Sequence, residues 1–215
     1  MTAIVFDLDG TLIDSAPDIR AALNHVLLAE GAEALTLAET IRFIGHGIPA
    51  LVRQAREFRG LGADRHEAMV GAMVARYQAA STVLTRPYEG VAAALAVLGA
   101  AGHPLGICTN KPLAATRQIL TDLSLEAPFG AVIGGDSLPV KKPDPAPLHA
   151  AFAALGAPPL LYVGDSEVDA ETAQAAGVPF ALFAPGYRKA PVASLPHRFA
   201  FDDFAQLPGL VAALA

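Results

Sequence analysis

A short apolar run that ends in two aspartates, Asp7 and Asp9, is the feature that most constrains this chain. The residues at positions 4–6 are β-branched or aromatic, which favours a strand buried on both faces. Asp7 then lies at the carboxyl end of that strand, where open α/β sheets bind ligands. Alternation along an extended segment turns Leu8 away, so we expect both carboxylates to face one spot. Two like charges there repel each other unless a cation or a proton lies between them.

The composition limits the classes of protein to consider. The 215 residues, 53% of them hydrophobic, are enough for one sizeable core and a small second lobe. A net charge of −6 without a basic stripe argues against nucleic-acid binding. The single cysteine, Cys108, excludes an internal disulfide and fits a reducing compartment. The chain shows neither a signal peptide nor an apolar run of the roughly 18 to 20 residues that span a bilayer. We therefore expect a cytoplasmic protein, either a monomer or a homodimer.

Strand and helix patterns alternate at short spacing through the second half of the chain. Strands are predicted at 105–109, 131–134, 160–163 and 180–183. Helices are predicted at 91–98, 113–123, 147–155, 168–176 and 204–214, the last one broken around Pro208-Gly209. This alternation predicts βαβ units, and so a Rossmann-like α/β core: a parallel sheet with helices on both faces.

A helical block interrupts this pattern between the first strand and the second. Only one proline, Pro49, occurs between Asp18 and Arg86, and apolar residues there recur at helical spacing. One of these helices is predicted to run from Leu37 through Ile44. We expect residues 16–86 to form a small all-helical domain, and residues 1–15 and 87–215 to form the α/β core.

Polar side chains follow each of the later predicted strands. Thr109 and Asn110 follow one strand, Lys142 comes after the next, and Asp165 and Asp169 follow a third. Taken singly, these residues could be helix caps or solvated turn residues. Taken together with the aspartates of the first strand, they favour one crevice at the carboxyl edge of the sheet.

Carboxylates gathered with a lysine and amide or hydroxyl donors are typical of phosphoryl transfer. A hard divalent cation such as Mg²⁺ prefers oxygen ligands and would neutralise the phosphate charge. The expected ligands are Asp7, Asp165 and the backbone carbonyl of Asp9. Asp169, four residues after Asp165, returns to the same side of a helix and could bind a metal-bound water or orient a ligand.

The remaining residues of this group suggest the other roles. Lys142 would place a positive charge on the transferring phosphoryl group, and Thr109 and Asn110 would donate hydrogen bonds to its oxygens. Asp7 is the expected nucleophile, which forms an aspartyl phosphate. Asp9 is the expected general acid and base.

Four motifs in order resemble those of the haloacid dehalogenase-like (HAD) phosphatases. They are Asp7-Leu8-Asp9-Gly10-Thr11, Thr109-Asn110, Lys142-Pro143, and Gly164-Asp165-Ser166 with Asp169. The resemblance covers nearly the whole chain and implies that the helical block is the cap domain of that family. Three further runs resemble the phosphoglycolate phosphatase branch, which implies 2-phosphoglycolate as the substrate: 108–112, 134–137 and 142–145.

The resemblance also implies that the cap selects the substrate. The loop Gly45-His46-Gly47 lies between two predicted helices, and His46 and Gly47 are the expected substrate-binding residues of the cap. A simple interhelical turn is the alternative interpretation. Arg42 and Arg53 could meet a substrate carboxylate, but solvated helix faces explain them better.

The same residues bear on several other functions. A phosphonatase needs a cap lysine, and no lysine occurs before Lys111. A haloacid dehalogenase would not need Asp9. A sugar-phosphate phosphatase or a phosphohexose mutase of the same family stays open, because the motifs barely separate these activities. A phospho-accepting signalling module would lack the long helical insertion, and the intact acidic set argues against a binding protein without activity.

Overall fold

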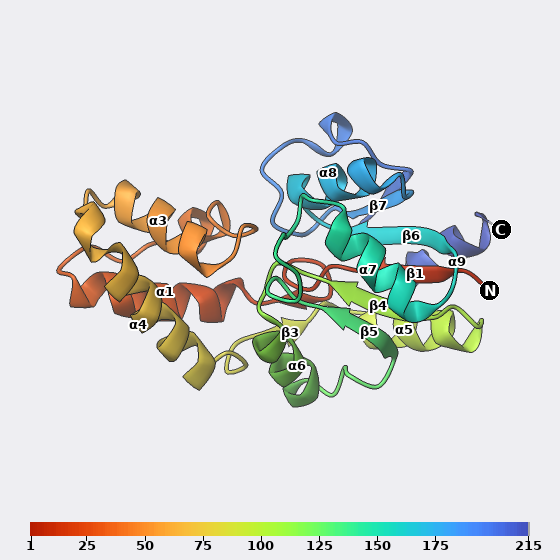
Figure 1. Cartoon of the computed structure of the whole chain (residues 1–215), viewed down its shortest axis with the longest axis horizontal. Coiled ribbons are helices and arrows are strands. Elements are labelled where there is room, and N and C mark those ends of the chain that lie inside the picture. The colour runs from red at the N-terminus through yellow and green to blue at the C-terminus, as the bar shows by residue number, and fades with distance from the viewer. Residues whose placement is uncertain (215) are drawn as a thin grey trace. The chain divides into compact units, whose positions relative to one another are not determined.

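The computed structural model describes residues 1–214, and the chain forms two compact units (Figure 1). One unit consists of Met1–Asp14 and the chain from Pro87 onward, and the other is Ser15–Arg86. The boundaries coincide with two short strands, β2 (Ile13–Asp14) and β3 (Arg86–Pro87), which pair with each other. Each unit is described below by itself.

The larger unit is built on a six-stranded sheet in the order β5-β4-β1-β6-β7-β8. Every neighbouring pair of these strands is parallel. The strands are β1 (Ala3–Phe6), β4 (Leu105–Cys108), β5 (Phe129–Ile133), β6 (Pro159–Gly164), β7 (Phe180–Phe183) and β8 (Phe199–Phe201). The chain adds strands outward on one side of β1 and then returns to add the others on its second side. β1 therefore lies at the topological switch point, where ligands bind in this class of fold.

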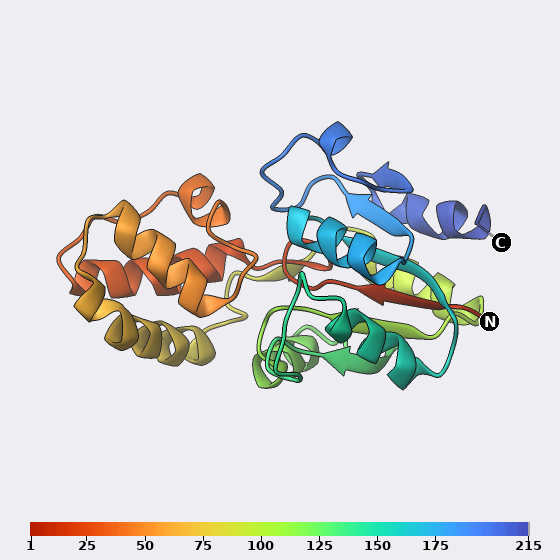
Figure 2. The same ribbon diagram turned by 45° about the horizontal axis from the view of Figure 1, so that its top comes forward.

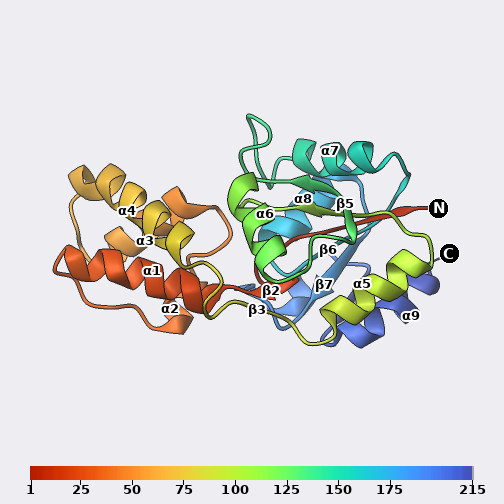
Figure 3. The same cartoon turned by 90° about the horizontal axis from the view of Figure 1, so that it is seen from below.

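Helices cover both faces of this sheet (Figures 2 and 3). α7 (Ala146–Leu155) and α8 (Glu167–Ala176) pack on one face, and α5 (Val91–Ala100) and α9 (Leu207–Ala212) lie on the other. α6 (Leu113–Asp122) follows β4 and packs beside β5. The predicted Rossmann-like α/β fold is confirmed.

The core beneath α7 and α8 follows from residue alternation along the central strands. Side chains at every second position of β1, β6 and β7 point to this face, where Val5, Tyr162 and Leu182 are fully buried. Phe152 of α7 and Ala173 of α8 pack against them. Burying this apolar surface stabilises the sheet at about 25 cal/mol per Å². The sheet therefore gives a rigid base for the loops at its carboxyl edge.

Three details of the predicted elements are corrected. The last helix is not broken at Pro208-Gly209: a 3₁₀ turn at Phe204–Gln206 precedes α9, and Pro208 lies in the first turn of α9. Proline is tolerated there because the first-turn N–H groups have no partner within the helix. The edge strand β8 was not predicted, because its three residues are too short to show alternation. α2 ends at Ile41 and not at Ile44.

The smaller unit is all-helical. Its elements are α1 (Ala16–Ala29), α2 (Leu37–Ile41), α3 (Ile48–Phe58), a 3₁₀ turn (Ala63–Arg65) and α4 (His66–Ala79). α4 buries Met69, Met73 and Tyr77, which recur at helical spacing, against α1 and α3. Across residues 1–214, no helix has both the length and the apolar character needed to cross a membrane.

A buried aspartate, Asp18, ties the end of this unit to its first helix. Its carboxylate accepts hydrogen bonds from the backbone N–H groups of Leu84 and Thr85, at 2.9 and 2.7 Å for the shortest contacts. The Thr85 hydroxyl donates a further bond at 2.8 Å. These neutral donors satisfy the hydrogen-bonding needs of the buried carboxylate.

Candidate active site

The strand register brings the predicted site segments together at the carboxyl edge of the sheet. Phe6, the last residue of β1, is opposite Ile107 of β4 and Val163 of β6. The next N–H, that of Asp7, donates to the Val163 carbonyl at 2.8 Å. Thr109 and Asp165 each lie two residues beyond those partners, so three loops leave the sheet side by side.

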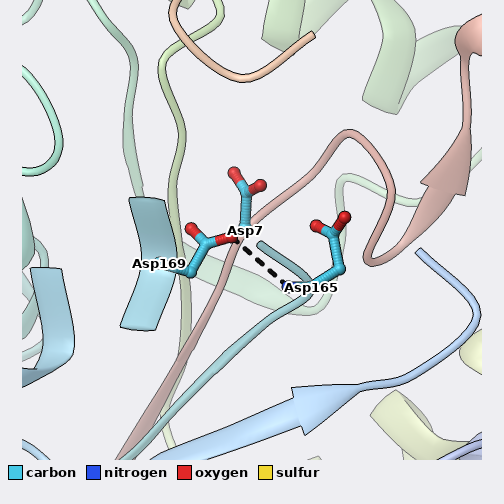
Figure 4. A group of neighbouring side chains, drawn as sticks. All are labelled: Asp7, Asp165 and Asp169. Atoms are coloured by element: carbon cyan, nitrogen blue, oxygen red, sulfur yellow. Dashed lines mark hydrogen bonds between the residues drawn. The ribbon is translucent and has the colours of Figure 1, made fainter. Parts of the chain in front are cut away.

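Three carboxylates, those of Asp7, Asp165 and Asp169, lie within 4.8 Å of one another (Figure 4). Asp7 follows β1, Asp165 follows β6, and Asp169 is in the first turn of α8. All three are buried. The Asp165 N–H donates to Asp169 Oδ2 at 3.3 Å, which is the dashed line in Figure 4. Such a group of oxygen ligands could hold a metal ion.

Lys142 supplies the positive charge inside this group. Its Nζ donates to Asp169 Oδ1 at 2.7 Å and to the Tyr162 hydroxyl at 2.8 Å. It also forms an ion pair with Asp7 Oδ1 at 2.9 Å. The Tyr162 hydroxyl in turn donates to Asp169 Oδ1 at 2.7 Å. Lys142 therefore links the first strand to α8 and has little freedom to move.

The electrostatics of this group differ between its members. Burial raises the pKa of Asp7 to about 7, although the Lys142 ammonium acts in the opposite direction. Burial raises the pKa of Asp165 well above its usual range, and the Asp169 and Asp7 carboxylates raise it further. For Asp169, burial is outweighed by Lys142 and by hydrogen bonds, and its pKa is lowered. The ionised forms of Asp7 and Asp165 are therefore disfavoured in this site. A bound cation would stabilise both carboxylates.

Asp169 serves both the site and its own helix. Its Oδ2 accepts hydrogen bonds from Ser166 N at 3.1 Å and Ser166 Oγ at 2.6 Å, where Ser166 is the N-cap of α8. Gly164 makes this approach possible, because a Cβ at that position would lie 2.5 Å from Asp169 Cβ. In the motif from Gly164 to Asp169, the glycine thus leaves space for the Asp169 side chain, and Asp169 accepts hydrogen bonds at the start of α8.

Asp9 turns toward a different cation. Both of its carboxylate oxygens accept hydrogen bonds from Lys111 Nζ, at 2.7 and 2.8 Å. Lys111 follows Thr109 and Asn110 after β4 and is buried. The sequence alone indicates no role for Lys111, because a charged residue beside a proline gives no signal of its partner.

Thr109 and Asn110 join the loops that surround Asp7. Thr109 is buried, and its Oγ1 accepts a hydrogen bond from Lys111 N at 3.2 Å. The Asn110 side-chain amide donates to the backbone carbonyl of Lys142 at 3.0 Å. These contacts hold the β4 loop against the Lys142 loop.

Residues 134–137 pack against the loop that follows β4. Asp136 Oδ1 accepts a hydrogen bond from Leu113 N at the start of α6. A Cβ on Gly135 would lie 2.2 Å from the Asn110 carbonyl oxygen. Only glycine allows this close approach, so this run shapes the β4 loop without contributing a reacting group.

The loop after β7 also reaches the site, a contact that the sequence does not predict. Tyr187 N donates to Asp165 Oδ2 at 2.5 Å, and the Tyr187 hydroxyl donates to Asp14 Oδ1 at 2.6 Å. Thr11 Oγ1 donates to Asp165 Oδ1 at 2.8 Å. The one available signal was that this loop, like the others, follows a buried parallel strand.

His46 and Gly47 belong to the smaller unit, directly before α3. His46 is exposed, and the flanking glycines Gly45 and Gly47 have φ values of 125° and 83°. These angles favour glycine strongly, so backbone conformation alone explains the two glycines of this turn. Arg42 and Arg53 are exposed in this unit, as expected for solvated helix faces.

The family model for haloacid dehalogenase-like hydrolases matches residues 4–183, which include Asp7, Thr109, Lys142, Asp165 and Asp169. The chain belongs to this family. The HAD family and fold predicted from the sequence are therefore confirmed.

Relatives of this HAD hydrolase extend over its full length. It is 52% identical over 213 residues to a phosphoglycolate phosphatase of Cereibacter sphaeroides, with 98% of each chain covered. It is 44% identical to a phosphoglycolate phosphatase of Rhodobacter capsulatus, covering 97% of this chain and 96% of the relative. The crystal structure of a predicted phosphoglycolate phosphatase from Haemophilus somnus superposes with a TM-score of 0.92 at 30% identity, covering 98% of this chain and 97% of the other. These similarities make the protein a phosphatase of the HAD family.

Proposed function

We propose that this protein is a Mg²⁺-dependent phosphatase of small phosphomonoesters, with 2-phosphoglycolate as its substrate. The observation that carries the proposal is the group of Asp7, Asp165 and Asp169 within 4.8 Å, with Lys142 inside it. The names of the full-length relatives support the choice of substrate.

The residues present fit a divalent cation. Asp7, Asp165 and the backbone carbonyl of Asp9 would hold it, and all three are the oxygen ligands that Mg²⁺ prefers. Asp169 is occupied by Lys142, Tyr162 and Ser166, so it would orient the other groups. A bound Mg²⁺ would neutralise charge on the phosphate and on the aspartates.

The first chemical step makes a bond between Asp7 and the substrate phosphorus. A carboxylate oxygen of Asp7 attacks the phosphorus atom, and the bond from phosphorus to the leaving oxygen breaks. Asp9 gives a proton to that oxygen, so the alcohol leaves neutral. Lys142, with donors from Thr109 and Asn110, stabilises the oxygens of the transferring group.

The second step returns Asp7 to its starting form. Asp9, now a carboxylate, takes a proton from a water molecule while that water attacks the phosphorus. The bond between phosphorus and Asp7 breaks, and inorganic phosphate is released. We propose that residues 16–86 act as a cap domain, with His46 and Gly47 as its substrate-binding residues.

We also propose a cytoplasmic location and a monomeric or homodimeric state. The single cysteine, Cys108, is free and buried, so the fold does not depend on an oxidising compartment.

The test is steady-state hydrolysis of 2-phosphoglycolate, p-nitrophenyl phosphate and about ten other cytosolic phosphate esters, with Mg²⁺ and with EDTA. We expect 2-phosphoglycolate to have the highest kcat/KM, since specificity is a ratio of such constants. Activity that survives chelation would exclude the metal mechanism. A sugar phosphate with a higher kcat/KM would keep the mechanism and replace the substrate.

A further inference from the structure

Lys111 is a buried cation whose ammonium group lies against the Asp9 carboxylate. Its Nζ lies 2.7 Å from Asp9 Oδ1 and 2.8 Å from Asp9 Oδ2. The side chains are 6% and 15% exposed, so water screens this pair far less than a surface pair. A lysine that contacts both oxygens fixes the rotation of the carboxylate as well as its position.

The backbone of Lys111 is held at both of its polar atoms. Its N–H donates to Thr109 Oγ1 at 3.2 Å, and its carbonyl accepts from Gly135 N at 2.8 Å. Gly135 has no room for a side chain, because a Cβ there would meet the Asn110 carbonyl. The backbone of Lys111 is therefore fixed in a packed loop. A fixed backbone is what a residue needs if it positions another side chain.

The Asp9 carboxylate contacts a different lysine from the one that pairs with Asp7 and Asp169. Lys142 forms ion pairs with Asp7 and Asp169, and Lys111 forms an ion pair with Asp9. These contacts match two different tasks, one at the phosphoryl group and one at the leaving oxygen.

We infer that Lys111 is a positioning residue that fixes the Asp9 carboxylate for proton transfer in both chemical steps. The inference rests on the proposed function, in which Asp9 protonates the leaving oxygen and then accepts a proton from water. Lys111 itself neither bonds to phosphorus nor loses a proton. A displaced Asp9 would slow both steps, since proton transfer requires hydrogen-bond reach.

The two steps can be separated by the choice of leaving group. p-Nitrophenolate leaves without a proton, so the first step with p-nitrophenyl phosphate needs little help from Asp9, whereas attack by water still needs it. In Lys111→Met we expect kcat for 2-phosphoglycolate to fall about 100-fold, within the range for general acid–base catalysis. With p-nitrophenyl phosphate we expect a rapid burst of about one nitrophenolate per active site, followed by slow turnover.

Three further variants make the result specific. Lys111→Arg, which keeps a two-pronged donor, should recover activity to within about tenfold of the wild type. Lys141→Met removes an exposed lysine of the same half of the chain and should stay within about twofold. Adding Lys111→Met to Asp9→Asn should cause no further loss beyond about twofold, because two residues that act through one group are not additive. Thermal unfolding by circular dichroism checks that each variant is folded.

The contrary outcomes are distinct. An equal fall for both substrates without a burst, or a further 100-fold loss in the double variant, would show that Lys111 contacts the substrate directly or only supports the fold. Unchanged activity of Lys111→Met beside an active wild type would overturn the role of Lys111 alone. A wild type without Mg²⁺-dependent hydrolysis of any ester would overturn the proposed function itself, and the inference with it.

Discussion

The two units of the chain each bury aspartate side chains, but they stabilise them in opposite ways. In the helical unit, Asp18 is surrounded by neutral donors from Leu84 and Thr85. In the α/β unit, Asp7 and Asp165 are buried beside each other and beside a third carboxylate. Asp18 is thus a structural group bound by neutral donors, whereas burial and mutual repulsion within the second group raise the pKa values of Asp7 and Asp165.

This difference teaches how to distinguish a structural carboxylate from a functional one. Burial alone does not separate them, since both kinds are almost inaccessible to water. The distinguishing feature is the number of carboxylates that share a site: Asp18 is bound by neutral donors, whereas three carboxylates of the α/β unit gather around the ammonium of Lys142.

The largest expected effect comes from Asp7→Asn. Removing the nucleophile should lower kcat by more than about 10⁴-fold. Without divalent cations, the melting temperature should be equal to or higher than that of the wild type, because one repelling buried charge is gone. Asp122→Asn, at the end of α6, is the matched control for both measurements. A clearly lower melting temperature of Asp7→Asn would mean that Asp7 resembles Asp18 after all.

Lys142→Met should affect activity and stability together. It removes the ammonium that contacts Asp169, Tyr162 and Asp7, so buried groups lose their partner. Loss of one member of a buried ion pair costs about 3–5 kcal/mol. Urea unfolding measures this cost, and hydrolysis should fall at least about 100-fold. If Lys142→Met were inactive but as stable as the wild type, Lys142 would act on the substrate without stabilising the fold.

The stability of the metal-free protein should fall as the pH rises from about 4 to about 7. The folded-state pKa of Asp7, about 7, lies above the value of about 3.9 for an unfolded aspartate, and that of Asp165 is raised as well. The folded protein therefore binds more protons than the unfolded chain in this window, and this stability is lost as they leave. Mg²⁺ at 100 times its Kd should restore about 2.7 kcal/mol. Thermal unfolding across pH, with and without Mg²⁺, tests this, and an identical pH profile in Asp7→Asn would contradict it.

Asp18→Ala is expected to have the smallest effect of the four, and only on stability. The N–H groups of Leu84 and Thr85 would lose their acceptor at a cost of about 2 kcal/mol. Chemical denaturation measures the change, with Asp64→Ala on the exposed 3₁₀ turn as the control. A stability equal to that of the wild type would show that the smaller unit does not depend on this carboxylate.

The sequence predicted the fold well because its signals were local. Strand and helix patterns alternate, and residues after each buried strand must meet at one edge of the sheet. The main errors came from short elements: β8 has only three residues, and a proline at the start of a helix was interpreted as a break.

The partners of the site residues were harder to predict. Asp7, Asp165 and Lys142 could be named from their positions after strands, but Lys111 and Tyr187 could not. Their roles depend on side-chain and backbone contacts between residues 102 and 22 positions apart. Sequence spacing carries no record of such contacts, so only coordinates reveal them.

Two glycines far apart in the chain, Gly10 and Gly186, pack closely against the side chain of Asp165. A methyl group at Gly10 would lie 2.4 Å from Asp165 Oδ2, and one at Gly186 would lie 2.2 Å from Asp165 Cβ. A larger residue at Gly10 or Gly186 could not add a substrate contact without displacing Asp165. Any change of specificity during evolution must begin elsewhere in the chain.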